Sequence, residues 1–140
     1  MVSLYRGAPN DVRKRISRTL SIEPKVMDSW LVALNTTRNI CCHHGRLWNR
    51  TLGARPALPR RKNDARWYEP FSVRADKPVA VLTVLNHMLA TAAPDSDWSA
   101  ETIRLLETRP PSDLSRMGFT EGWQECPFWT VGQNGAKAAK

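Results

Sequence analysis

The sequence predicts an all-α protein of one domain. Three observations indicate this class: apolar residues recur at helical spacing, helix-starting and helix-ending residues flank those segments, and no stretch alternates as a strand would. The chain has 140 residues, of which 41% are hydrophobic, and this is enough to bury one core. We therefore expect a single helical domain over residues 1–130 and a frayed tail over residues 131–140.

The first predicted helix covers residues 10–20. Asn10 suits the N-cap position, where a side-chain oxygen accepts a hydrogen bond from the first turn, and Asp11 complements the helix dipole. Every fourth residue of the segment is apolar, which places one apolar stripe along the helix. That stripe consists of Val12, Ile16 and Leu20.

The second predicted helix is longer and begins near Pro24, since proline suits the first helical position. We expect it to run to His44, with Gly45 as its stop. Projection at about 100° per residue separates a core face from a polar side. The core face consists of Val26, Trp30, Ala33, Thr37, Ile40, Cys41 and His44, and the polar side of Asp28, Asn35 and Asn39.

Residues 52–77 are predicted to form a basic irregular loop. The segment contains the charge cluster "RRKNDAR" and three prolines that break any regular element. These prolines are Pro56, Pro59 and Pro70.

Two further helices are predicted, over residues 78–92 and 98–108. Pro110 and Pro111 end the second of them, because proline removes a helical donor and restricts the residue before it. The segment "MGFTEGWQECPFW" then forms a Trp-rich tail that folds back onto the helices. The apolar side of the helix over residues 78–92 consists of Val81, Leu82, Leu85, Met88 and Leu89.

The charge of the chain is positive and uneven. The net charge is +8; residues 1–77 hold 16 Lys/Arg and 6 Asp/Glu, a net of +10, whereas residues 78–140 hold 5 and 7, a net of −2. A basic half of this size is typical of a protein that binds a polyanion. The alternative is a solvated surface that merely keeps the protein in solution.

The sequence indicates a cytoplasmic protein with no membrane partner. The first ten residues contain no apolar run of signal-peptide length, and no stretch approaches the roughly 20 apolar residues that span a bilayer. The chain has three cysteines, an odd number, and two of them are adjacent, which suits a structural disulfide poorly. We therefore expect free thiols in a reducing compartment.

The most unusual stretch is "RNICCHHGRLWNR", which places two cysteines beside two histidines. Structural zinc sites leave two to four residues between paired cysteines, because adjacent helical side chains diverge by about 100°. Cys126 and His87 are the only other residues of these types. The sequence therefore disfavours a metal site and indicates no other cofactor, and Cys41 and Cys42 are expected to be small packing residues.

The same stretch suits acid–base chemistry. Projection puts His44 on the core face, as an ordinary packed histidine, and turns His43 about 100° away from it. Asn39 lies one turn before His43, and Arg38 lies on the other flank with the reach to come round. Histidine moves protons near neutral pH, and arginine stabilises phosphate charge, so the pattern suits a phosphodiester. A chance pairing of Arg and His on one helix is the alternative.

Residues 38–43 also match the R-N-x-x-x-H motif of HEPN-type ribonucleases. The longer stretch "SWLVALNTTRNICCHHGRLWNR" resembles the signature of the Abi abortive-infection proteins of bacteria. That family is similar to the HEPN ribonuclease part of the type VI CRISPR effectors. The resemblance extends to "LYRGAPNDVRKRIS" upstream and to "ALP", "MGFTEGW" and "PFW" downstream, and so covers most of residues 1–130.

The resemblance implies a HEPN-like helical bundle that cleaves RNA without a metal ion, in phage defence or as a toxin. The ribose 2′-hydroxyl would attack the adjacent phosphate and leave a 2′,3′-cyclic phosphate and a 5′-hydroxyl. His43 would be the general acid or base and Arg38 the phosphate and transition-state partner, while Asn39 would orient His43 or the phosphate. Such sites usually combine two motifs that face each other across a dimer.

Abi family members are usually about twice as long, and this chain resembles their second half. The helical bundle is therefore expected to be incomplete. Its exposed apolar surface would be covered by a second copy, in a homodimer, or by a partner chain that supplies the missing N-terminal half.

Further residues predicted to contact RNA are Arg46, Trp48, Asn49, Arg50, Arg60, Arg61 and Lys62. Trp48 is expected to pack and so to fix the chain just after the helix, with base stacking as the alternative, and Arg46 and Arg50 suit phosphate contacts and solvated charge equally. The basic run after Pro59 suits sequence-independent, salt-dependent RNA contacts. A second function stays open, namely a non-catalytic RNA-binding or regulatory partner of a defence system.

Overall fold

The computed structural model describes residues 1–130, and within this range the regular secondary structure is all helical, with six α-helices and no strand. This confirms the all-α fold class; the tail predicted over residues 131–140 lies outside the described residues. The elements are α1 (Val2–Gly7), α2 (Asn10–Thr19), α3 (Pro24–Cys42), the 3₁₀ helix η1 (Ala65–Trp67), α4 (Pro78–Ala92), α5 (Trp98–Glu107), α6 (Pro111–Met117) and the 3₁₀ helix η2 (Trp123–Glu125).

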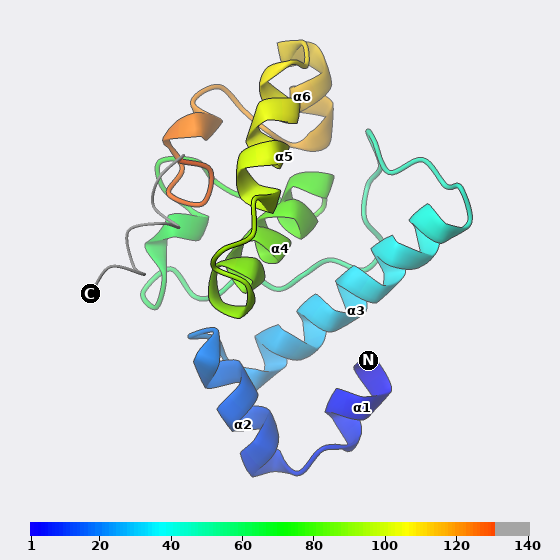
Figure 1. Ribbon diagram of the computed structural model, residues 1–140, viewed down its shortest axis with the longest axis vertical. Helices are drawn as coiled ribbons and strands as arrows, with labels where there is room; N and C mark the ends of the chain where they lie inside the picture. The colour runs from blue at the N-terminus through cyan, green and yellow to red at the C-terminus, as the bar shows by residue number, and fades with distance from the viewer. Residues whose placement is uncertain (131–140) are drawn as a thin grey trace.

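Helix α3 is the long diagonal of the molecule, with α1 and α2 on one side and α4 on the other (Figure 1). It begins at Pro24, where the missing N–H costs nothing because the first turn has no acceptor for it. Trp30 is fully buried, as predicted, and its Nε1 donates to the carbonyl oxygen of Ala57 over 2.8 Å. The first half of α3 is therefore packed into the core and hydrogen-bonded to the segment that follows the helix.

Helix α1 was not predicted, because it spans six residues and buries only Tyr5, too little for a periodic pattern. The Tyr5 hydroxyl bonds the Ser17 hydroxyl of α2 over 3.0 Å and donates to the carbonyl oxygen of Pro24. Arg6 pairs with Asp28 of α3 through two 2.8 Å bonds. These tertiary contacts, rather than local propensity, hold α1 in place.

The prediction for α2 was right in its extent and wrong in two details. Asn10 is the first helical residue rather than the N-cap; Pro9 holds the cap position, and no side chain caps the helix. The predicted apolar stripe is only partly buried, since Ile16 remains 38% exposed and Ser17 is fully buried instead. The reason is that α2 contacts α3 through its Ser17 side, where Tyr5 supplies a hydroxyl partner.

Helix α4 is buried on more sides than one apolar stripe allows. Val81 is buried as predicted, whereas the other residues of the predicted side are only half-buried. The buried set is Pro78, Val79, Ala80, Val81, Thr83, Val84 and Asn86. Thr83 satisfies its hydroxyl inside the helix by donating to the carbonyl oxygen of Val79.

The segment predicted as a basic irregular loop, residues 52–77, also contributes to the core. It contains η1, and Trp67 within η1 is fully buried, with its ring centroid 5.4 Å from that of Trp30 and 4.7 Å from that of Phe128. Phe71 and Val73 are buried as well. The aromatic side chains of this segment have neither helical nor alternating spacing, so their spacing could not predict that they are buried.

The C-terminal segment folds back onto the helices, as predicted. Pro111 does not simply end a helix: it occupies the first turn of α6, a helix that was not predicted from the sequence. Gly118 ends α6 with φ +95°, and a Cβ there would meet the Lys77 side chain at 2.6 Å. The buried residues of the tail are Phe119, Trp123, Cys126, Phe128 and Trp129.

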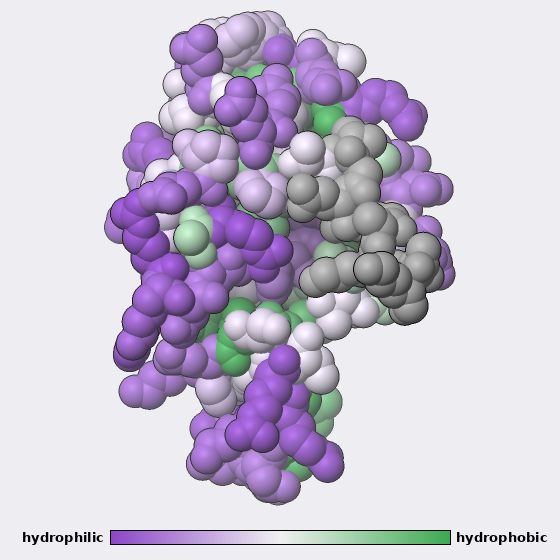
Figure 2. All heavy atoms as spheres, turned by 90° about the vertical axis from the view of Figure 1, so that its left-hand side faces the viewer, coloured by the Kyte–Doolittle hydropathy of each residue, from purple (hydrophilic) through white to green (hydrophobic). Residues whose placement is uncertain are grey.

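The molecule narrows between the part that contains α1 and α2 and the rest, and hydrophobic residues reach the surface there (Figure 2). Met1 and Leu4 are 85% and 81% exposed. Among residues 1–130, no helix combines the length and the hydrophobicity that crossing a bilayer requires.

Candidate active site at the end of helix α3

Helix α3 ends two residues earlier than predicted, in a turn built from the two histidines. Cys42 is the last helical residue, and His43 is the C-cap, with φ −93° and ψ 23°. His44 adopts the left-handed conformation, with φ +55°. The Gly45 N–H bonds the carbonyl oxygen of Ile40, and the His44 N–H that of Cys41, which together form a Schellman motif.

Gly45 follows the end of α3, as predicted. Glycine is required there because a side chain would not fit, and not because of the φ angle of this residue. The Schellman turn brings Gly45 back onto α3, so that a Cβ at this position would lie 2.8 Å from the Ile40 carbonyl oxygen. A residue with a Cβ cannot fit without moving the backbone. The left-handed position is instead occupied by His44, a residue type that is enriched there among non-glycines.

The predicted core face of α3 is correct only in its first half. Val26, Trp30 and Ala33 are buried, but Thr37 and Ile40 are half-buried. Cys41 and His44 are exposed, as is Cys42. The prediction failed because the last two turns of α3 run beyond the elements that cover its beginning (Figure 1). His44 is therefore no core histidine, and the two cysteines are not packing residues.

Arg38, Asn39 and His43 are all exposed in these last turns. The Arg38 guanidinium lies 3.5 Å from Asn39 Oδ1, at the outer limit of a hydrogen bond. The backbone N–H of His43 donates to the carbonyl oxygen of Asn39, which ties the histidine to the turn before it. Among the described residues no group hydrogen-bonds the His43 imidazole, so it can face a ligand.

The surroundings of these residues are electropositive. From Ser29 to Pro59 the chain contains no Asp or Glu and four Arg or Lys residues. Within residues 1–130, Arg38, Arg46 and Arg50 form no ion pair with a carboxylate. Guanidinium groups without carboxylate partners remain available to an anion such as a phosphodiester.

The loop after the helix is held by Trp48. The N–H of Arg50 bonds the carbonyl oxygen of Leu47, Asn49 adopts φ +58°, and Trp48 between them is half-buried. The Arg116 guanidinium of α6 lies over the Trp48 ring, 5.3 Å from its centroid. Trp48 thus packs after the helix, as expected, and joins the loop to α6.

One comparison with known proteins identifies the segment that carries this site. Residues 1–49 match the family of Abi-like proteins. This confirms the resemblance to the Abi family over α1, α2, α3 and the turn that follows them. No curated protein and no solved structure matches the chain.

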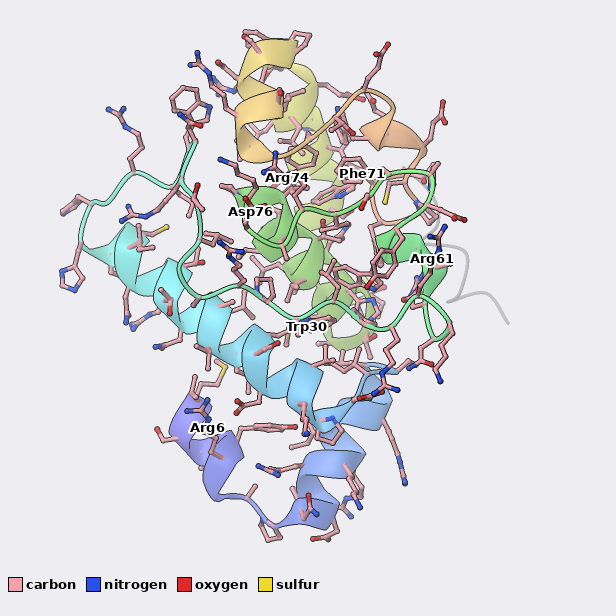
Figure 3. The ribbon with its side chains drawn as sticks, turned by 180° about the vertical axis from the view of Figure 1, so that it is seen from behind. Arg6, Trp30, Arg61, Phe71, Arg74 and Asp76 are labelled. Carbon is pink, nitrogen blue, oxygen red and sulfur yellow. The ribbon has the colours of Figure 1, made fainter. Side chains whose placement is uncertain are left out.

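The Abi-like segment contains Arg38, Asn39, His43, Arg46, Trp48 and Asn49, and it ends just before Arg50. The second group of residues predicted to bind RNA, Arg60, Arg61 and Lys62, lies outside this segment. Figure 3 shows Arg61 on the opposite side of the molecule from the end of α3. Arg61 pairs with Glu69, and Arg60 lies 3.8 Å from Glu23, whereas Lys62 forms no ion pair among the described residues. The structure therefore does not gather the two predicted RNA-binding groups into one site.

The third histidine, His87, does not lie at the end of α3 with His43 and His44. His87 lies in α4 among Trp30, Trp67 and Phe128, and its Nε2 lies 2.8 Å from the carbonyl oxygen of Leu20. Burial lowers the pKa of His87. Within residues 1–130, no three His, Cys, Asp or Glu residues come together in a way that could hold a metal ion.

An apolar groove beside the motif was predicted only in general terms, as exposed surface awaiting a partner. A cavity of about 350 Å³ opens between α3 and α4, next to Arg38. It is lined by Met1, Leu31, Leu34, Asn35, Thr37, Arg38, Val81 and Leu85. Leu34 of α3 and Leu85 of α4, which line this groove, are only half-buried, whereas two closely packed helices would bury them fully.

Proposed function

We propose that this chain is an Abi-family defence protein that acts as a metal-independent endoribonuclease of the HEPN type in the cytoplasm. The observation that carries the proposal is the exposed set Arg38, Asn39 and His43 at the end of α3, in a segment without carboxylates. A surface of this kind favours a polyanion, and the histidine supplies a group that can transfer protons near neutral pH.

In the proposed reaction, the ribose 2′-oxygen forms a bond to the adjacent phosphorus while the bond to the 5′-oxygen of the next nucleotide breaks. One imidazole takes the 2′-hydroxyl proton, and a proton passes from an acid to the leaving 5′-oxygen. Arg38 donates to the non-bridging oxygens and stabilises the charge that grows on them. Asn39 lies beside Arg38 and orients the phosphate or His43. The products are a 2′,3′-cyclic phosphate and a 5′-hydroxyl.

A single chain presents one copy of this motif, so a second histidine has to come from elsewhere. We propose that a second copy of the chain, in a homodimer, supplies it, with a partner chain that adds further helices as the alternative. The apolar groove next to Arg38 and the exposed Met1 and Leu4 support an interface on this side. A two-fold interface there would bring two Arg38/His43 pairs toward each other.

The decisive test compares two adjacent exposed histidines. His43→Ala should abolish cleavage of labelled single-stranded RNA while leaving RNA affinity within a few-fold, since one contact among many is lost. His44→Ala is the matched control and should keep cleavage. Analysis of product ends should find cyclic phosphate, and EDTA should have no effect. Equal cleavage by wild type and His43→Ala, or a strict need for added metal, would exclude the mechanism.

The alternative is a non-catalytic RNA-binding partner of a defence system. One observation favours it: no described residue hydrogen-bonds the His43 imidazole, whereas a catalytic histidine is commonly oriented by such a partner. In that case wild type and both histidine variants would bind RNA with similar affinity, and none would cut it.

A further inference from the structure

A cavity of about 470 Å³ lies behind the loop that follows α3, and the proposed cleavage step does not use it. Its walls come from that loop and from α5 and α6. They are formed by Trp48, Leu105, Leu106, Arg109, Asp113 and Met117. A volume of this size falls in the range of small-ligand sites, which begins at roughly 300 Å³.

An aromatic side chain and charged side chains that form no ion pair among the described residues lie together at this cavity. Trp48 is only half-buried, and the Arg116 guanidinium lies over its ring. Arg109 and Arg116 form no ion pair within residues 1–130, and neither does Asp113. An aromatic ring can stack on a nucleobase, the arginines can reach phosphate, and the carboxylate can accept a bond from a base N–H.

Leu105 adds an apolar rim that the fold itself does not use. It is 61% exposed, although its neighbour Leu106 is buried in the core. The flat face of a base placed in the cavity would cover this side chain. The cavity is largely apolar. Arg109 lines it beside Asp113, and Arg116 lies over the Trp48 ring, so two guanidinium groups can meet the phosphate backbone that carries a base placed in the cavity.

The cavity is also close enough to the proposed cleavage site to be reached by the same strand. Five peptide units separate His43 from Trp48, and an extended chain spans at most about 3.6 Å per residue. The two Cα atoms are therefore no more than about 18 Å apart. A strand with one phosphodiester at His43 can place a base a few nucleotides away into the cavity.

We propose that the Trp48 cavity is a seat for one unpaired nucleobase of single-stranded RNA. This inference rests on the proposed function in taking RNA as the ligand, and it deepens that function by naming where a base beside the cut linkage is held. The seat recognises an unstacked base, so double-stranded RNA of the same sequence does not occupy it.

The affinity of the full chain for a labelled single-stranded RNA, measured by fluorescence anisotropy in the His43→Ala background, tests the proposal without cleavage. Trp48→Ala should weaken binding about tenfold, and Trp48→Phe should recover most of the loss. The dependence of affinity on salt should not change, because a stacked base releases no counterions. Trp98→Ala, at another half-buried tryptophan outside the cavity, should leave affinity unchanged.

A second pair of variants covers the case in which Trp48→Ala fails to fold. Leu105→Glu places a carboxylate on the exposed rim and should weaken RNA binding several-fold more than Ala100→Glu. Ala100 is exposed on the same helix and lies about 140° round it from Leu105, so both variants change the charge equally. The proposed base-binding cavity is wrong if Leu105→Glu and Ala100→Glu weaken RNA binding equally. It is also wrong if the Trp48→Ala protein folds and binds RNA like its parent.

The two proposals fail in different ways. If His43→Ala cleaves RNA like wild type while Trp48→Ala still weakens binding, the cleavage mechanism is wrong and the seat stands. If cleavage depends on His43 but neither cavity variant affects RNA affinity, the seat is wrong and the cleavage mechanism stands.

Discussion

At the scale of single residues, His43 and His44 show how neighbouring identical side chains acquire different roles. His43 closes α3 as its C-cap, and His44 turns the chain in the left-handed region. Helical projection assumed that both belong to the helix and so placed His44 in the core. Both histidines are exposed, because the last turns of α3 run beyond the elements that cover its beginning. The Schellman turn, completed by the Gly45 bond to Ile40, explains why His44 lies outside the helix.

Gly45→Ala should destabilise the protein by about 1–3 kcal/mol, because the new Cβ would meet the Ile40 carbonyl oxygen at 2.8 Å. Urea denaturation followed by circular dichroism measures the change. Gly53→Ala is the matched control: nothing lies within 4 Å of a Cβ there, so stability should stay within about 0.5 kcal/mol. If the two alanines have equal effects, the close approach at Gly45 has no energetic weight.

At the scale of elements, α3 changes its environment along its length. Its first turns are buried between α1 and α2 on one side and α4 on the other, and its last turns are exposed. Its apolar periodicity continues through Ile40 and Cys41, which is why the sequence predicted one continuous core face. Periodicity reports which residues share a side, but it does not report where the neighbouring elements stop.

The burial of His87, where α4 packs against the elements around it, should make stability depend on pH. Burial lowers the pKa of His87 in the folded protein, so the unfolded chain binds more protons below its own pKa near 6.5. The free energy of unfolding should therefore fall as pH drops through this range. His87→Gln keeps a donor for the Leu20 carbonyl oxygen and removes the titration.

Chemical denaturation at pH 7.5 and 5.5 should show a larger loss of stability for wild type than for His87→Gln. These two values lie on either side of the unfolded pKa. A loss of the same size in both proteins would mean that other groups govern the acid sensitivity. His44→Gln, which changes an exposed histidine, is the control and should behave like wild type.

At the scale of the whole molecule, charge and apolar surface are both unevenly distributed. The basic residues concentrate in residues 1–77, and the apolar grooves lie where α1 meets α2, α3 and α4. A groove of about 640 Å³ beside Leu4 and Ile16 extends this surface away from Arg38. Side chains of this kind are costly to leave in water, so a second macromolecule is expected to cover them.

If the covering molecule is a second copy, sedimentation should find a dimer of the wild type at micromolar concentration. Leu4→Glu should then shift the protein to monomer without changing its helical content, because this side chain is 81% exposed. Leu105→Glu, at an exposed leucine on α5, should remain dimeric. A wild type that is monomeric at every concentration tested would contradict the two-fold composite site.

The sequence by itself determined the helical class, the start of α3 at Pro24, the burial of Trp30 and the resemblance of the first segment to the Abi family. These follow from local patterns, since proline placement, helical spacing and a motif are properties of adjacent residues. The exposure of His43 also followed from helical spacing, although its proposed chemistry remains to be tested.

Only the tertiary structure decided what depends on distant contacts. It buried Trp67 from a segment without periodicity, separated Arg61 from the end of α3, and set Trp48 beside α5 and α6. It also left the last turns of α3 without a covering element. The physical reason is common to all four: burial depends on which surfaces meet after the chain has folded, and no local pattern of residues specifies that meeting.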